Sequence, residues 1–213
     1  MTTGPALRRT TPLGQGVLLV ALNVSWALVM ARFGRGDIYW LVGLHALLVI
    51  GVVLALRGGS LREVAAPRGR DILLGVAVGV IMTLATYPAY EAARVLVPGL
   101  STEVARLYHA ASTQTLATAL AWTMVILTGE ELLWRSAWIA IWEPRWGATA
   151  AAVSSVLAYA VTQFGSGSIV VVLLACTCGA IWTGLRMYTG RVLPGLIAHA
   201  IWTPVVILLH PVV

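Results

Sequence analysis

The chain has 213 residues, of which 59% are hydrophobic and only 10% are charged. A soluble domain usually carries about 25% charged residues, so this composition excludes an ordinary soluble globular protein. The formal net charge of +6 comes from arginine without a single lysine, and most of the arginines lie at the ends of apolar blocks. That placement is typical of membrane topology signals and not of a surface that binds nucleic acid.

Long apolar blocks follow one another along the chain. They cover residues 14–34, 38–56, 72–92, 115–141, 147–165, 168–187 and 192–209. A helix needs about 20 apolar residues to cross a bilayer, and in lipid its backbone must form hydrogen bonds within the segment. The blocks lack the polar–apolar alternation of β-barrel strands. The sequence therefore predicts an all-α, polytopic membrane helix bundle of about seven transmembrane helices, organised as a single transmembrane domain over residues 1–213.

The first block follows two arginines, as the apolar core of a signal peptide would. The block is long, and no clear small-x-small cleavage site follows it, so we expect a retained helix. Arginine placement predicts a multi-pass protein of the cell membrane with its N-terminus in the cytoplasm and its C-terminus outside. The inside would hold Arg8, Arg9, Arg57, Arg62, Arg68, Arg70, Arg145, Arg186 and Arg191, and the outside would hold Arg32, Arg35, Arg94 and Arg106.

Two longer segments link the blocks. Residues 57–71 are rich in arginine, and residues 96–114 begin with a turn-forming Pro-Gly pair. In the second segment we expect a short interfacial helix that is capped by Ser101 or Thr102 and carries Arg106.

The fourth block carries three charged side chains, Glu130, Glu131 and Arg135, inside an apolar helix. Each charge near the bilayer centre costs about 2.5–3.5 kcal/mol on insertion scales, so all three need a role. Glu131 and Arg135 are four residues apart and can pair on one helix face. Glu130 is rotated by about 100° from Glu131 and is expected to point elsewhere. The pair can be explained by helix packing, whereas Glu130 is left as a candidate functional group.

Polar side chains recur in the later blocks. His199 and Thr203 lie one turn apart on the same face of the last block, and Gln163 lies one turn after Tyr159 in the fifth. Each of them alone is typical of a packing residue or an interhelical hydrogen bond. If they form one site with Glu130, these side chains must converge in the folded bundle.

Small and aromatic residues have simpler interpretations. Gly75 and Gly79 suit close packing of helices. Trp142 and Trp146 fit the aromatic belt at the cytoplasmic end of the fourth block.

The charged motif resembles the first motif of the CPBP family of intramembrane proteases (CAAX protease and bacteriocin-processing, also called Abi). That motif is two Glu, three further residues and Arg, which Glu130, Glu131 and Arg135 match. The similarity covers about residues 115–209, which we expect to be a CPBP-like catalytic core. The order and spacing of the later motifs are also similar.

Two positions depart from the family pattern. The second motif is an aromatic residue, three residues and His, and the matching pair here is Tyr159 and Gln163. The last motif is His, three residues and Asn or Asp, and the matching pair is His199 and Thr203. Gln163 cannot accept a proton near neutral pH, but it can position a water molecule, and Thr203 keeps one hydroxyl donor.

The resemblance implies an intramembrane endopeptidase. In the family, the first Glu and the second-motif His are thought to activate the attacking water, and the last His and Asn to stabilise the oxyanion. Carried over, Glu130 is the general base, Glu131 and Arg135 support it, and His199 is an oxyanion donor or an acid.

We expect no cofactor and no metal, because the paired-His zinc helix motif is absent and Gln163 is a poor zinc ligand. The expected partners are membrane lipid and a membrane-anchored or exported peptide substrate. Candidate substrates are a C-terminal sorting helix, a leader peptide and a membrane-anchored regulator. The use of Arg without Lys indicates a GC-rich, bacterial source, which disfavours a prenylated CAAX substrate.

Three alternatives remain at this point. The chain can be a non-catalytic CPBP-like membrane scaffold or immunity protein. Exosortase-type transpeptidases use Cys, Arg and His, but Cys176 and Cys178 fit buried packing positions better. A small transporter fits the intramembrane charges, yet the sequence lacks repeat symmetry and broken-helix signals.

Overall fold

The fold is built from helices throughout the part of the chain that is described. The computed structural model describes residues 11–32 and 38–213, without the side chains of residues 58–65, 110 and 111. The helices are α1 (Pro12–Met30), α2 (Ile38–Ala65), α3 (Gly69–Leu96), α4 (Leu100–Ala111), α5 (Leu116–Glu130), η2 (Glu131–Trp138), α6 (Ile139–Trp146), α7 (Ala148–Gln163), η3 (Phe164–Ser166), α8 (Ile169–Thr189), α9 (Leu193–Pro204) and η4 (Val205–Leu209). This arrangement confirms the predicted all-α membrane bundle.

Within these ranges, six helical runs are long and apolar enough to cross a membrane. They are Pro12–Met30, Ile38–Arg57, Gly69–Leu96, Leu116–Trp146, Ala148–Ser166 and Ile169–Thr189. Helices α5, η2 and α6 follow one another without a break and together form the fourth of these spans. The last apolar helix, Leu193–Leu209, is shorter than the others. It corresponds to the seventh predicted block.

The short interfacial helix is present as α4, but its predicted cap is wrong. The N-cap residue is Gly99, with a φ of 83°, and no side chain caps the helix. Because glycine adopts this left-handed conformation without strain, the turn needs no Ser or Thr hydroxyl. The hydroxyl of Ser101 instead accepts a hydrogen bond at 3.1 Å from the hydroxyl of Tyr90 on α3. This contact ties α4 to the end of α3.

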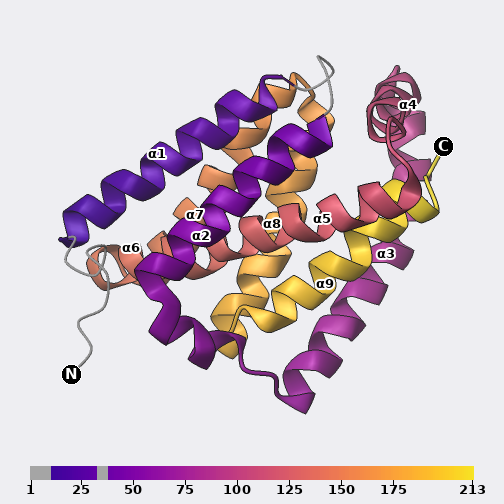
Figure 1. Ribbon diagram of the computed structural model, residues 1–213. Helices are drawn as coiled ribbons and strands as arrows, with labels where there is room; N and C mark the ends of the chain where they lie inside the picture. The colour runs from indigo at the N-terminus through magenta and orange to yellow at the C-terminus, as the bar shows by residue number, and fades with distance from the viewer. Residues whose placement is uncertain (1–10, 33–37) are drawn as a thin grey trace.

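Helix α9 lies in the middle of the bundle, beside α3 and α5 (Figure 1). It also packs against α8. Gly75 and Gly79 of α3 allow the close approach of α9, because an added Cβ would lie 2.8 Å from the carbonyl oxygen of Pro194 or 3.0 Å from the Cα of Ala198. The predicted role of these two glycines is confirmed.

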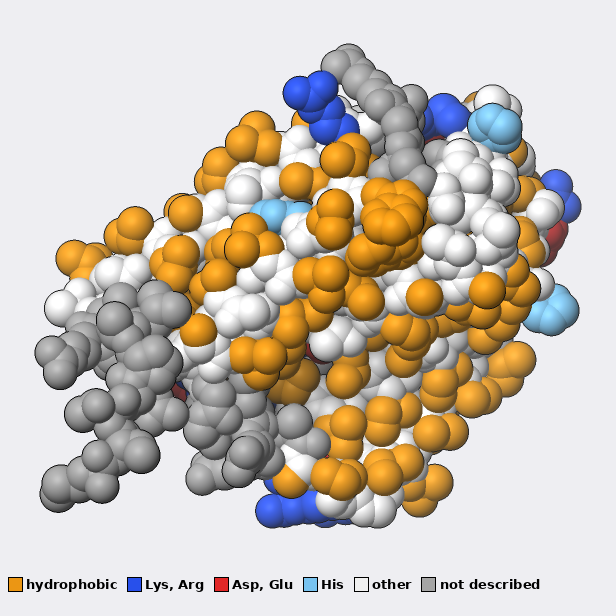
Figure 2. Space-filling view, in the orientation of Figure 1, with side chains coloured by type: hydrophobic (Ala, Val, Ile, Leu, Met, Phe, Trp, Pro, Cys, Tyr) orange, Lys and Arg blue, Asp and Glu red, His pale blue; other side chains and the backbone are white. Residues whose placement is uncertain are grey.

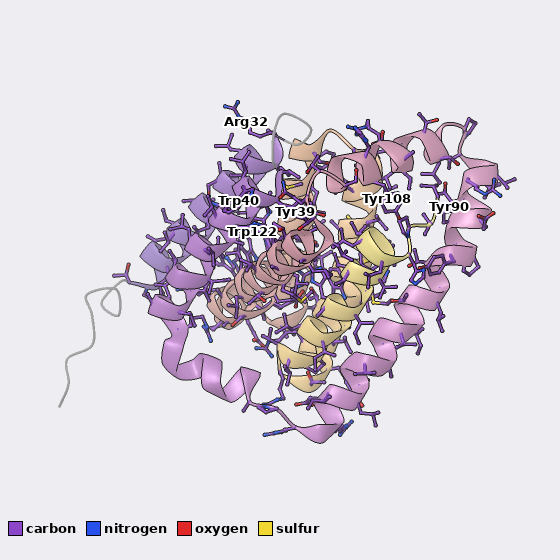
Figure 3. The ribbon with its side chains drawn as sticks, turned by 45° about the vertical axis from the view of Figure 1, so that its right-hand side comes forward. Arg32, Tyr39, Trp40, Tyr90, Tyr108 and Trp122 are labelled. Atoms are coloured by element: carbon purple, nitrogen blue, oxygen red, sulfur yellow. The ribbon has the colours of Figure 1, made fainter. Side chains whose placement is uncertain are left out.

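Hydrophobic side chains cover much of the visible face, and arginines appear at its edges (Figure 2). Aromatic residues gather at one end of the bundle, where Tyr39, Trp40, Tyr108 and Trp122 lie on the same side as Arg32 (Figure 3). Such aromatic and basic residues are typical of the level where a membrane meets water. The apolar surface between the two ends is the part that faces lipid.

Candidate active site

The site begins where the fourth span changes its helical geometry. Residues Glu131–Trp138 form a π-helix, which pairs each N–H with the carbonyl five residues earlier and is frequent at functional sites. Other helices satisfy carbonyls along this segment. Ser155 of α7 donates its hydroxyl to the carbonyl of Trp134 at 2.7 Å, and Nε of Arg186 on α8 donates to the carbonyl of Arg135 at 3.2 Å. Packing against α7 and α8 therefore supports the wide turn.

His199 of α9 lies between the two neighbouring carboxylates. Its Nδ1 is 3.1 Å from Oε1 of Glu131, and its Nε2 is 3.7 Å from Oε2 of Glu130. All three side chains are buried. The sequence predicted that Glu130 and Glu131 point to different places, and this prediction is wrong because both carboxylates contact His199. Both carboxylates reach the same ring, because each of the two imidazole nitrogens contacts one of them.

Aromatic side chains from α7 and α8 hold two members of this group. The hydroxyl of Tyr159 donates a hydrogen bond to Oε2 of Glu130 at 3.1 Å. The indole of Trp182 is stacked on His199, with ring centroids 3.5 Å apart and an angle of 16° between the planes. These contacts fix the orientation of Glu130 and of the imidazole.

Arg135 is completely buried behind the carboxylates. Its NH1 lies 3.7 Å from Oε1 of Glu131, which confirms the predicted ion pair. Its guanidinium also lies over the rings of Tyr159 and Trp182, at 4.5 and 5.5 Å from their centroids. Gly179 makes room for it, because an added Cβ there would lie 2.9 Å from NH2 of Arg135. The pair is thus enclosed by aromatic faces instead of water.

Gln163 and Thr203 make none of the described contacts with this group. Gln163 is buried at the end of α7, and its amide nitrogen donates to the hydroxyl of Thr162 at 3.3 Å. The hydroxyl of Thr203 is buried and has no hydrogen-bond partner among the described residues. The structure therefore joins Glu130, Glu131 and His199 directly, whereas Gln163 and Thr203 are placed by sequence position alone.

Sequence reasoning missed the roles of Tyr159 and Trp182. Tyr159 was visible as the aromatic of the second motif, but its hydrogen bond to Glu130 depends on how α7 crosses α5. Trp182 carries no sequence signal, because its stacking on His199 depends on the packing of α8 against α9. Gly195 is a further missed residue, since an added Cβ there would lie 3.1 Å from Oε2 of Glu131.

The formal charges of the group favour one additional bound proton. With Glu130 and Glu131 ionised, Arg135 positive and His199 neutral, the buried group would hold one uncompensated negative charge. Such a charge is costly inside a membrane, and one added proton removes it. The arrangement can hold this proton between Glu130 and His199. Among the described residues, no group of three or more His, Cys, Asp or Glu side chains is placed to hold a metal ion.

Comparison with known families agrees with this part of the chain. Residues 112–205 match the family model described as type II CAAX prenyl endopeptidase Rce1-like. The matched range contains the two carboxylates, Arg135 and His199, and it confirms the resemblance to CAAX-type membrane proteases. Searches of the curated proteins and of the solved structures found no match.

Proposed function

Because residues 112–205 are Rce1-like and that family is one of peptidases, we propose that this chain is an intramembrane endopeptidase that uses a water molecule activated by Glu130. The observation that supports the proposal best is the contact of His199 with both Glu130 and Glu131 inside the membrane domain. A histidine that serves only packing needs one hydrogen-bond partner. His199 instead contacts both Glu131, which pairs with Arg135, and Glu130, which has no arginine partner in an ion pair among the described residues.

Glu130 would act first, as the general base. It takes a proton from water, and the water oxygen attacks the carbonyl carbon of the scissile amide. The resulting oxyanion is stabilised by hydrogen-bond donors or positive charge, for which protonated His199 is the candidate. When the C–N bond breaks, the leaving nitrogen takes the proton that Glu130 had accepted. Water is consumed, and the carboxylate is regenerated.

Glu131 would act through His199. A hydrogen bond from Nδ1–H to Glu131 fixes the tautomer, so that the lone pair of Nε2 faces Glu130. Nε2 can then accept a proton from Glu130 or return it. Tyr159 supports the ionised form of Glu130, because its hydroxyl donates to the carboxylate. In this scheme Glu131, Arg135 and Tyr159 are positioning residues, while Glu130 and His199 handle protons.

The substrate would be a membrane-anchored or exported peptide, because the group lies within the membrane-spanning part of the chain. A C-terminal sorting helix, a leader peptide and a membrane-anchored regulator all present an extended segment next to an apolar one. We extend the proposed site to Gln163 and Thr203 by their motif positions. Gln163 would hold the attacking water, and Thr203 would donate to the oxyanion.

A non-catalytic membrane scaffold or immunity protein is the second candidate. The observation that favours it is Gln163, which replaces the family's second-motif His and has its described side-chain hydrogen bond to Thr162 rather than to Glu130. In that case the buried charges would serve helix packing alone.

Glu130→Gln separates the two functions, because it keeps the shape of the side chain and removes the base. Peptide termini in the membrane fraction of producing cells would be compared between the wild type and the variant. We expect products that depend on this protein to fall by about 10²–10⁴-fold, the usual contribution of a general base. Glu91→Gln, at an exposed carboxylate of α3, is the matched control. Products that persist unchanged in Glu130→Gln, at equal protein level, contradict the peptidase function.

A further inference from the structure

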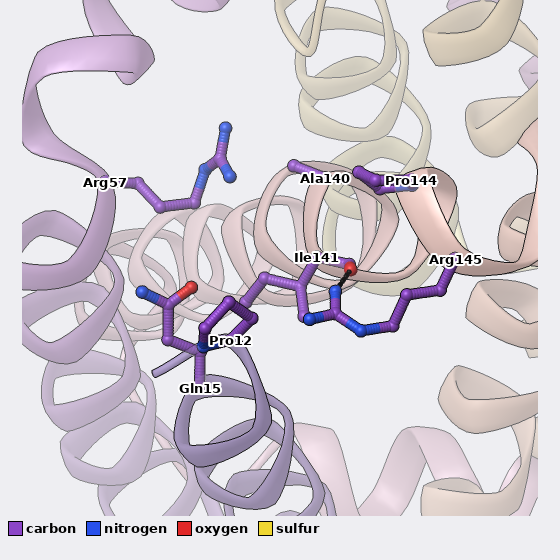
Figure 4. A pocket seen from close by; sticks show the side chains of 7 residues that line it. All are labelled: Pro12, Gln15, Arg57, Ala140, Ile141, Pro144 and Arg145. Atoms are coloured by element: carbon purple, nitrogen blue, oxygen red, sulfur yellow. Dashed lines mark hydrogen bonds between the residues drawn. The ribbon is translucent and has the colours of Figure 1, made fainter. Parts of the chain in front are cut away.

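A pocket lies far from the carboxylates, at the end of the bundle where α1 starts. Its volume is about 480 Å³, and it is open rather than enclosed. Figure 4 shows Pro12 and Gln15 of α1 on one side, with Arg57 of α2 and Arg145 of α6 extending toward the middle from two further helices. Three segments that are distant in the sequence thus contribute to one concave surface.

The pocket lies at the level where the membrane spans end. The first span begins at Pro12, the second ends at Arg57, and the fourth ends at Trp146, just beyond Arg145. Next to the pocket, the rings of Trp142 and Trp146 are stacked with centroids 4.3 Å apart. Tryptophan is typical of the headgroup level of a bilayer. A ligand in this pocket would therefore lie among lipid headgroups.

The lining of the pocket is positively charged. Arg57 and Arg145 contribute guanidinium groups, and none of the described residues that line the pocket is acidic. Arg186 adds a third positive charge that acts on Arg57, while the nearby carboxylate of Glu143 acts on Arg186. The start of α1 adds the partial positive charge of a helix N-terminus. These features favour an anion with several oxygen atoms.

Arg145 already has a defined orientation toward this ligand position. Its NH1 donates to the carbonyl of Ile141 at 2.7 Å, and its guanidinium lies 5.9 Å from the ring centroid of Trp142. The other N–H groups of the Arg145 guanidinium are left to bind an anion. The planar guanidinium suits phosphate, because two of its N–H groups can donate to two phosphate oxygens.

We propose that this pocket binds the phosphate group of an anionic phospholipid, held by Arg57 and Arg145. The site does not depend on the peptidase proposal, because it uses none of the residues of the buried carboxylate group. A phospholipid fits better than a free anion, since the pocket opens at the headgroup level and apolar side chains such as Ile141 and Pro12 line it beside the arginines.

The test uses the full chain, purified in a neutral detergent. Native mass spectrometry would compare the retention of phosphatidylglycerol with that of phosphatidylcholine of the same acyl chains. The double variant R57Q/R145Q removes two positive charges from the pocket. The double variant R68Q/R70Q is the matched control, because it removes the same charge from exposed arginines that do not line the pocket. A separate arm measures thermal stabilisation by inorganic phosphate.

We expect one phosphatidylglycerol to be retained preferentially by the wild type and by R68Q/R70Q, and its affinity to fall about tenfold or more in R57Q/R145Q. Arg145→Glu changes an exposed side chain and gives the same loss if the double variant fails to fold. Equal losses in both double variants would show diffuse attraction and overturn the site. Stabilisation by millimolar inorganic phosphate that matches phosphatidylglycerol would overturn the lipid as its ligand.

Discussion

Two adjacent carboxylates acquire different environments from a single turn of helix. Glu131 is completely buried and lies against Arg135, Gly195 and Nδ1 of His199. Glu130 keeps a small exposed fraction of 8% and is contacted by the hydroxyl of Tyr159. The better enclosed carboxylate suits a fixed ionic role, whereas the other, which is slightly less enclosed and has no ion pair with Arg135, is the one that we propose to react. This difference gives each Glu of the motif its own proposed task.

Arg135→Ala is expected to lower the free energy of unfolding by about 3–5 kcal/mol, because it leaves Glu131 buried without its cation. The loss would appear as earlier unfolding of the purified protein in detergent. Arg94→Ala is the control, since Arg94 forms an exposed pair with Glu91 at a helix end. We expect little effect from it. Equal stability of the wild type and Arg135→Ala would show that the buried ion pair contributes nothing.

Gln163→His tests whether the second-motif position takes part in the reaction. His would restore a group that can accept a proton, in a position that is already buried. We expect product formation to stay the same or rise, with Glu130→Gln in the same background abolishing it. Product formation would be measured for both variants at matched protein levels. A loss of more than about tenfold, at an equal protein level, would contradict the assignment of position 163 to the second motif.

At the scale of elements, contacts with α3 position α9, the helix that carries His199. Gly75 and Gly79 face α9, and Gly79 lies directly against Ala198, the residue before His199. The carboxylate of Asp71 at the start of α3 also forms an ion pair of 2.6 Å with Arg191, two residues before α9 begins. Helix α9 is thus held along its side and at its N-terminal end.

Gly79→Leu is expected to push α9 away from α3. An added Cβ would already lie 3.0 Å from the backbone of Ala198, and overpacking of this kind costs about 1–3 kcal/mol. Product formation should fall together with stability, because His199 moves relative to Glu130. Gly51→Leu, at a glycine of α2 with no neighbouring atom within 4 Å, is the matched control. If both variants behave alike, the α3–α9 contact is not what positions His199.

At the scale of the whole molecule, the apolar blocks predicted every membrane helix to within a few residues. This worked because lipid imposes the length and hydropathy of a span directly on the sequence. The interior was harder to predict. The π-helix at Glu131–Trp138 depends on carbonyl partners that Ser155 and Arg186 bring from other helices, and no local pattern encodes them.

The candidate site was also predicted only in part. Spacing placed Glu131 and Arg135 on one face, and that pair is present. Spacing could not place Glu130 beside His199, because the contact joins α5 to α9 across 69 residues and depends on the central position of α9. For the same reason, the roles of Gln163 and Thr203 stay predictions.

Orientation remains a prediction as well, with a cytoplasmic N-terminus and an external C-terminus. Arg8, Arg9 and Arg35, on which it partly depends, lie outside the described residues, and the side chain of Arg62 does too. Single cysteines at Ser101 and Arg68, in a background without Cys176 and Cys178, would be treated with a membrane-impermeant maleimide in intact cells. We expect labelling at position 101 alone, and labelling of both after permeabilisation. The reverse pattern in intact cells would invert the topology.

The stacking of Trp182 on His199 gives the molecule an optical property. An excited indole transfers an electron readily to a protonated imidazole in van der Waals contact and only poorly to a neutral one. In the proposed proton exchange, the fluorescence of Trp182 is therefore expected to be quenched when the proton is on His199 and to recover when the proton moves to Glu130. The difference in emission between the wild type and Trp182→Phe, followed against pH, would then report where the proton resides without any substrate.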